Sequence, residues 1–195
     1  MNELFDITGK CIVITGGAGI LCGQMARSLA QTGASVAILD RNLAGAREVC
    51  DQIATGGGKA VAIECNVLET GSVARAVEQA IEQLGRIDVL VNGAGGNKRE
   101  ATCVPPETFF DLDADAIKWV FELNCIGTIL PSQAVGRHMA DRGSGVIVNI
   151  SSMCAFTPLT RIAAYSAAKA AVSNFTQWLA VNLAPNHSTA IRVNA

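Results

Sequence analysis

The feature that most constrains the fold of this chain is an alternation of short apolar runs with segments of helical periodicity. Residues 11–14 form the first apolar run, which ends in Thr15 and a glycine-rich turn, and apolar residues then return at helical spacing up to Gly33. This sequence of signals repeats to the end of the chain. Strands that are joined by single helices must be parallel, with right-handed crossovers, so we predict one doubly wound, Rossmann-type α/β sheet in three layers.

The remaining elements follow from the same periodicities and from capping signals. The predicted later strands are residues 35–39, 60–65, 87–91, 146–150 and 191–194. The predicted later helices run from the capping residue Asn42 to about Thr55, and over residues 73–84, 114–140 and 163–184. We expect one domain over residues 1–195, truncated after the start of the sixth strand, with the substrate lid absent.

Composition narrows the class of protein. The chain has 195 residues, which is within the usual size of one domain, and half of them are hydrophobic while 16% are charged. The net charge of −2 argues against disorder and against nucleic-acid binding through basic patches. No apolar run is long enough to span a membrane and no export signal opens the chain, so we expect a cytoplasmic protein.

Cysteine and histidine spacing gives no sign of a metal site. The seven cysteines include no C-x-x-C pair and are odd in number, which predicts reduced thiols. His138 and His187 have no partner at metal-ligand spacing, and we predict that both lie at the surface or at helix ends.

The turn after the first strand is a candidate nucleotide site. Gly16, Gly17 and Gly19 lie where backbone amides and a helix N-terminus can face a phosphate, although a tight strand-to-helix connection would need the same glycines. Asp40 follows the second strand, where a carboxylate can accept hydrogen bonds from both ribose hydroxyls and repel a 2′-phosphate. NAD is therefore favoured as the cofactor. Arg41 leaves NADP open, because an arginine can pair with a 2′-phosphate.

A second group of residues can carry acid–base chemistry. Tyr165 and Lys169 are four residues apart in a predicted helix, so their side chains share one face, and an ammonium near a phenol favours the phenolate. Alone, such a pair could equally be an ordinary surface pair. Ser152 follows the fifth strand and thus lies at the same sheet edge as the glycine turn, which favours an active site.

These motifs resemble the short-chain dehydrogenase/reductase family over the whole chain. The resemblance rests on the turn from Thr15 to Leu21, on Asn92-Gly93-Ala94-Gly95, on Asn124, and on a serine thirteen residues before Tyr165-x-x-x-Lys169. It implies that Tyr165 exchanges a proton with the substrate oxygen, Ser152 fixes that oxygen, Lys169 also holds the nicotinamide ribose, and Asn124 anchors a relay water. The implied cofactor contacts are Gly16, Gly17, Gly19, Ile20, Leu21, Asp40, Arg41, Asn66, Val67, Asn92, Gly93, Ala94, Gly95, Tyr165 and Lys169.

The chain departs from the family pattern in ways that resemble one of its branches. Ile20 and Cys22 replace glycines, and Asn66 replaces an aspartate. The stretches GGAGILC, NGAGGN, FFDLD and PLTR resemble the D-mannonate oxidoreductase-like (fructuronate reductase-like) enzymes. The resemblance implies hydride transfer between NAD(H) and a carbonyl or secondary alcohol of a sugar acid such as D-mannonate or D-fructuronate. Lys98, Arg99 and Arg161 are candidates for binding the substrate carboxylate, although loop cations are often only solvated charges.

Two other functions stay open at this point. One is a non-catalytic or truncated NAD-binding or assembly module, and the other is an NADP-dependent reductase of another carbonyl class, such as a ketoacyl or steroid substrate. The helices that contain Asn124 and Tyr165 are apolar over much of their surface, and the shortage of charge predicts that another subunit covers some apolar surface. The resemblance implies a homodimer or homotetramer formed through these two helices.

Overall fold

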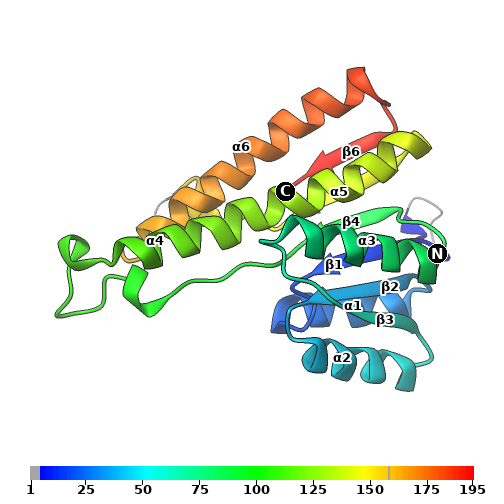
Figure 1. Ribbon diagram of the computed structural model, residues 1–195, viewed down its shortest axis with the longest axis horizontal. Coiled ribbons are helices and arrows are strands. Elements are labelled where there is room, and N and C mark those ends of the chain that lie inside the picture. Colours follow the sequence, from blue (N-terminus) through cyan, green and yellow to red (C-terminus); the bar gives the residue numbers. More distant parts are fainter. Residues whose placement is uncertain (1–4, 158) are drawn as a thin grey trace.

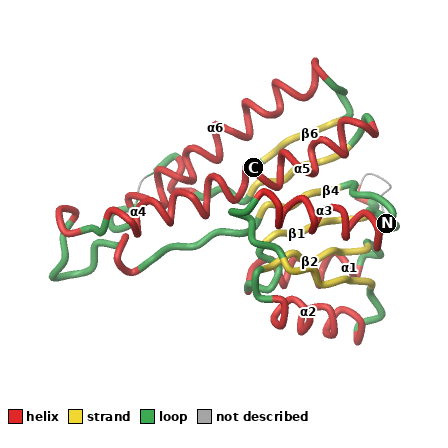
Figure 2. The backbone as a smooth tube through the Cα atoms, in the orientation of Figure 1, coloured by secondary structure: helices red, strands yellow, loops and turns green. Residues whose placement is uncertain are grey.

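The computed structural model describes residues 5–157 and 159–195, and its centre is a sheet of six parallel strands (Figures 1 and 2). Along the sheet the order is β3-β2-β1-β4-β5-β6, so the direction of winding reverses between β1 and β4. This order confirms the predicted doubly wound sheet. The strands are β1 (Cys11–Thr15), β2 (Ser35–Asp40), β3 (Lys59–Glu64), β4 (Val89–Asn92), β5 (Gly145–Asn149) and β6 (Ile191–Asn194).

Helices cover both faces of the sheet, as a three-layer fold requires. They are α1 (Ile20–Gln31), α2 (Leu43–Thr55), α3 (Thr70–Leu84), α4 (Ala114–Phe121), α5 (Gly127–Arg142) and α6 (Ala163–Asn186). Successive side chains of a strand point to opposite faces, so Ile12 and Ile14 pack with α1 and α2, whereas Val13 packs in the core under α3, α5 and α6. The strand periodicity thus builds two separate cores.

The predicted long helix over residues 114–140 is not a continuous α-helix. Between α4 and α5 the chain forms a π-helical segment, η4 (Glu122–Ile126), which contains Asn124. The side-chain Nδ2 of Asn124 donates to the carbonyl oxygen of Val120, and Thr128 Oγ1 donates to the carbonyl oxygen of Asn124. Such single-turn bulges are often found at functional sites, and periodicity cannot predict them because the apolar spacing on either side is preserved. Together α4 and the chain before it extend beyond the sheet (Figure 1).

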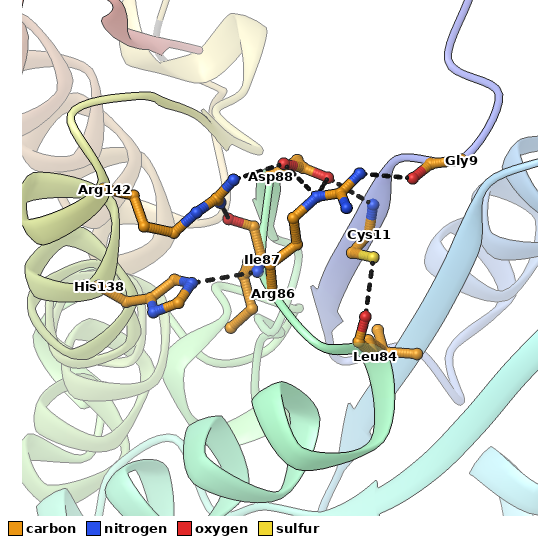
Figure 3. Close-up of polar contacts among 8 residues, drawn as sticks. All are labelled: Gly9, Cys11, Leu84, Arg86, Ile87, Asp88, His138 and Arg142. Carbon is orange, nitrogen blue, oxygen red and sulfur yellow. Dashed lines mark hydrogen bonds and ion pairs between the residues drawn. The ribbon is translucent and has the colours of Figure 1, made fainter.

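A cluster of polar contacts ties β1, β4 and α5 together at the amino ends of the strands (Figure 3). The carboxylate of Asp88 accepts hydrogen bonds from the backbone N–H of Cys11 at 2.9 Å and from Arg86 Nε at 2.9 Å. Arg142, at the end of α5, donates to the same carboxylate at 3.3 Å. One carboxylate therefore joins three elements that are distant in sequence.

His138, which was predicted to lie at the surface or at a helix end, is half-buried near the C-terminal end of α5 and belongs to the same region. Its Nε2 accepts a hydrogen bond from the backbone N–H of Ile87 at 3.2 Å (Figure 3). Burial lowers the pKa of His138, and the nearby Arg142 acts in the same direction. The neutral imidazole, which alone can accept this bond, is therefore the favoured form.

The remaining general predictions can be compared with the described residues. All seven cysteines are free thiols, as predicted. In residues 5–157 and 159–195 no group of three or more His, Cys, Asp or Glu side chains could hold a metal ion, and no helix there has the length and hydropathy needed to cross a membrane. Pro158, the first residue of the PLTR stretch, lies outside the described part of the chain.

Candidate active site

Two adjoining hollows lie at the carboxyl ends of the strands. The outer hollow, of about 200 Å³, is bordered by Arg41, Asn66, Val67, Ala94, Trp119 and Leu123. The inner hollow, of about 380 Å³, is bordered by Gly19, Ile20, Leu21, Gly93, Asn124, Tyr165 and Lys169. Both hollows share Gly16, Asp40, Gly95 and Gly96, so they form one continuous cleft. The structure therefore brings most of the candidate nucleotide residues and two of the acid–base residues together.

The glycine turn after β1 exposes its backbone to the cleft, because Gly16 has no side chain. Gly16 has φ +68°, and a Cβ on it would lie 2.7 Å from the Cα of Ala94, so a side chain is excluded there. A Cβ on Gly17 would instead lie 2.6 Å from the side chain of Ile38, so glycine is needed there for the turn to pack against β2. Gly17 borders neither hollow. The first turn of α1 has no acidic side chain, which leaves its N-terminus suitable for an anion.

Asp40 is held firmly at the junction of the two hollows. Its Oδ2 accepts a hydrogen bond from the backbone N–H of Ala18 at 3.0 Å, and its Oδ1 accepts one from the N–H of Asn42 at 2.9 Å. An ionised carboxylate has about four acceptor positions, so these bonds orient the group and still leave positions for two hydroxyl donors.

Lys169 and Tyr165 lie together on α6 and face the inner hollow. The Nζ of Lys169 donates to the carbonyl oxygen of Ile150 at 2.7 Å and lies 5.6 Å from the centre of the Tyr165 ring. The lysine side chain is buried, and burial lowers its pKa, while the thiols of Cys154 and Cys22 act in the opposite direction. The bond to Ile150 therefore fixes the position of the lysine nitrogen beside the phenol ring, where burial disfavours its charged form.

Asn124 performs a structural task that the sequence did not reveal. It is fully buried, and its Nδ2 donates to the carbonyl oxygens of Gly96 and Val120, each at 2.7 Å, while its Oδ1 accepts from the N–H of Gly96 at 3.2 Å. The π-helical segment thus clamps the loop after β4. Both N–H donors of the Asn124 amide are occupied. A relay water could therefore bind Asn124 only by donating a hydrogen bond to Oδ1.

Ser152 is near the cleft but does not border either hollow. Its Oγ lies 2.8 Å from the Sγ of Cys154 and accepts a hydrogen bond from the Cys154 N–H at 3.4 Å. Among the described residues, no hydrogen bond joins Ser152 to Tyr165. The predicted contact between serine, tyrosine and lysine is therefore present for the latter two only.

The three candidate carboxylate-binding cations are dispersed. Lys98 Nζ lies 4.5 Å above the ring of Trp119, and Arg99 forms an ion pair with Glu107 at 3.2 Å. Arg161 is exposed, and its carbonyl oxygen accepts a hydrogen bond from the backbone N–H of Cys103 at 2.9 Å. Of these three described side chains, none borders either hollow.

A buried polar network supports the sheet beneath the cleft, and sequence reasoning missed it. Thr15 Oγ1 accepts from the backbone N–H groups of Gly93 and Ala94, which joins β1 to the loop after β4. Asn92, which was predicted as a cofactor contact, is instead buried and donates to Asn149 Oδ1 and to Ser132 Oγ, each at 2.8 Å. The signal that could have revealed the pair is an asparagine at the end of each of two neighbouring apolar strands.

Cys22, which replaces a glycine of the family pattern, packs directly against Gly93. A Cβ on Gly93 would overlap the sulfur of Cys22. We therefore expect Gly93→Ala to lower the free energy of unfolding by about 1–3 kcal/mol, and Cys22→Ala in the same chain to recover much of that loss. Urea unfolding of the four members of the double-mutant cycle measures the coupling.

Gly136→Ala is the matched control for that cycle. A Cβ at Gly136, within α5, would lie 4.0 Å from Ile147, at an ordinary contact distance. We expect this change to be neutral or stabilising, because alanine is a better helix former than glycine. Additive effects of Gly93→Ala and Cys22→Ala would contradict the proposed shared space.

The chain is similar in sequence and structure to known oxidoreductases. A family model described as short chain dehydrogenase matches residues 10–195. The uncharacterised oxidoreductase UxuB of Bacillus subtilis (strain 168) is 43% identical over 198 residues, which is 97% of this chain and 70% of that protein. The 5-keto-D-gluconate 5-reductase of Escherichia coli (strain K12) is 35% identical over 196 residues, which is 100% of this chain and 72% of that protein. A crystal structure from Haemophilus influenza, provisionally described as a D-mannonate oxidoreductase with bound NAD, shares 45% identity, with a TM-score of 0.91 over 97% of this chain and 70% of that one.

Proposed function

The chain belongs to the short chain dehydrogenase family, and on that premise we propose that it transfers a hydride between NAD(H) and a carbonyl or secondary-alcohol carbon of a sugar acid such as D-mannonate or D-fructuronate. The observation that carries this proposal is the single cleft in which Asp40 lies at the junction of the two hollows and the Tyr165–Lys169 pair borders the inner hollow. The similar structure that contains NAD supports the choice of cofactor. The similarity to a 5-keto-D-gluconate 5-reductase supports an oxidised sugar acid as the class of substrate.

The residues of the cleft fit a dinucleotide along its length. Gly16 and the N-terminus of α1 would take the pyrophosphate, because Gly16 has no side chain to block the approach and the first turn of α1 contains no acidic residue. Asp40 would accept hydrogen bonds from the ribose hydroxyls, and Asn66 and Val67 would border the adenine. When bound, the cofactor supplies or accepts the hydride.

The chemical step requires a proton as well as a hydride. In this proposal Tyr165 gives its proton to the substrate oxygen during reduction and takes it back during oxidation. Lys169 stabilises the phenolate that remains, since its ammonium is held beside the ring by the bond to Ile150. Ser152 donates a hydrogen bond to the substrate oxygen, and Asn124 holds the loop that borders the cleft.

Cofactor preference gives a direct test. We expect the chain to oxidise NADH with D-fructuronate and to use NADPH poorly, because the Asp40 carboxylate would repel a 2′-phosphate. Asp40→Ser should reduce the ratio of kcat/KM for NADH to that for NADPH by about tenfold or more, the effect of roughly one charge-assisted hydrogen bond. Steady-state rates with both cofactors measure this ratio, and a preference for NADPH in the unsubstituted chain would favour the alternative in which Arg41 binds the phosphate.

Recognition of an acid substrate is assigned to Arg161. Its side chain is exposed and forms no salt bridge with a carboxylate among the described residues, so it is available to a substrate carboxylate. Arg161→Ala should raise KM for D-fructuronate by about 10- to 100-fold and leave KM for a neutral ketose nearly unchanged. Arg99→Ala is the control, since Arg99 is already paired with Glu107. An equal change in KM for the acid and the neutral substrate would exclude the assignment.

Association of subunits is proposed on the same basis. Trp178 and Val181, on α6, are 58% and 74% exposed. Large apolar side chains on one exposed helix face favour contact with a second copy of the chain. We therefore also propose that the chain forms a homodimer or homotetramer, in which subunits contact each other through the helices that contain Asn124 and Tyr165.

A further inference from the structure

We infer that Cys154 is a positioning residue for Ser152: its thiol donates a hydrogen bond to the serine oxygen, so that the serine hydroxyl keeps its own proton for the substrate oxygen. This inference rests on the proposed function, in which Ser152 contacts the substrate. It assigns a task to a residue two positions beyond the serine that the family motif does not include.

The contact comes from the local shape of the chain after β5. Ser152 has an extended backbone, with φ −157° and ψ 155°, and caps a 3₁₀ turn, η5 (Met153–Ala155). This turn directs the side chain of Cys154 back toward the cap, where Sγ lies 2.8 Å from the serine Oγ. Cys154 is only 4% exposed, so water competes little for the thiol.

The balance of donors and acceptors gives the direction of the bond. A serine hydroxyl has one proton and two lone pairs, and the N–H of Cys154, which can only donate, uses one lone pair. If the thiol donates to the second lone pair, the serine proton must point to another acceptor. If the serine donated to sulfur, a weak acceptor, it would have no proton left for the substrate oxygen, which gains negative charge during reduction.

The backbone around Ser152 is already fixed, so the rotation of its side chain is what the thiol can control. Ile150 accepts from Lys169 Nζ at 2.7 Å, and Ser151 Oγ lies 2.6 Å from Ser173 Oγ on α6. These contacts hold the segment against α6 but do not touch the Ser152 hydroxyl. The described contacts of that hydroxyl are both with Cys154.

Kinetics of matched variants test the inference. We expect Cys154→Ala to lower kcat for carbonyl reduction about tenfold, the effect of one misplaced hydrogen bond, with KM for NADH unchanged. Cys154→Ser, which keeps a donor, should retain kcat within about threefold of the unsubstituted chain. Cys11→Ala is the control, because it also removes a buried thiol that donates a hydrogen bond, to Leu84, at the opposite edge of the sheet. Equal losses of kcat in Cys154→Ala and Cys154→Ser, or no loss in Cys154→Ala, would overturn the inference.

A spectroscopic measurement decides the same question without turnover. The infrared S–H stretching band of Cys154 is isolated by subtracting the spectrum of Cys154→Ala from that of the unsubstituted chain. Ser152→Ala should shift this band toward the position of a free thiol, and an unshifted band would overturn the inference even in an active enzyme. Absence of turnover in the unsubstituted chain with every carbonyl substrate would contradict the proposed function, whereas the band shift would still decide whether the thiol donates to Ser152.

Discussion

Tyr165→Phe is expected to lower kcat for NADH-dependent carbonyl reduction about 10²- to 10⁴-fold, the usual contribution of a positioned general acid. Tyr165 is the only tyrosine of the chain, so no other phenol can replace it. Phenylalanine keeps the ring near Lys169 Nζ, and the variant should therefore fold and bind NADH as the unsubstituted chain does. Initial rates of NADH oxidation and a fluorescence titration with NADH separate the two effects.

The control for this experiment is Trp178→Phe, which also replaces an aromatic residue on α6 but lies at an exposed position. It should leave kcat within about twofold, because Trp178 borders neither hollow and phenylalanine keeps an apolar aromatic side chain at the proposed subunit contact. Unchanged turnover in Tyr165→Phe would remove the tyrosine from the chemistry. NADH binding without turnover in both the unsubstituted chain and the variant would favour the non-catalytic binding module.

Asp88→Asn is expected to lower the free energy of unfolding by about 2–3 kcal/mol at pH 7, because it weakens charge-assisted hydrogen bonds to Arg86 and Arg142. Burial alone would raise the pKa of Asp88, but the bonds from Cys11, Arg86 and Arg142 outweigh burial and hold the pKa below its usual value. Urea unfolding at a series of pH values measures both the loss and its dependence on ionisation.

The sign of the pH dependence follows from that lowered pKa. A carboxylate whose pKa is lower in the folded state stabilises the fold above its unfolded pKa, which is about 3.9. This stabilisation is lost as the pH falls through the folded value, so the difference between Asp88→Asn and the unsubstituted chain should shrink below about pH 4. A difference that is constant down to acid pH would show that the charge of Asp88 is not responsible.

Asp115→Asn is the matched control for Asp88→Asn. Asp115 pairs with Lys118 at 2.9 Å, close to the Asp88–Arg86 distance, but its side chain is 87% exposed whereas that of Asp88 is 14% exposed. An exposed pair three residues apart contributes at most about 0.5 kcal/mol. A loss in Asp115→Asn as large as that in Asp88→Asn would contradict the importance of burial and shared partners at Asp88.

The family and the sheet could be predicted because both are encoded in local patterns. Alternating apolar runs and helical segments predicted the strands and their parallel arrangement, and the sheet order confirms this. The spacing of Ser152, Tyr165 and Lys169 predicted the family, which the match over residues 10–195 confirms. The long helix predicted over residues 114–140 is present, but its π-helical turn around Asn124 was not predicted, because the hydrogen bonds of Asn124 to Gly96 join it to a distant loop.

By itself the amino-acid sequence determined which residue types reach the carboxyl edge of the sheet, because period and turn chemistry are properties of neighbouring residues. Only the tertiary structure decided which partners those side chains take there. Lys98 lies over the ring of Trp119, and the sulfur of Cys22 fills the position that a side chain on Gly93 would need. Ser152 contacts Cys154. Each of these contacts depends on the distances and rotamers of packed side chains, and hydrophobic periodicity contains no information about either.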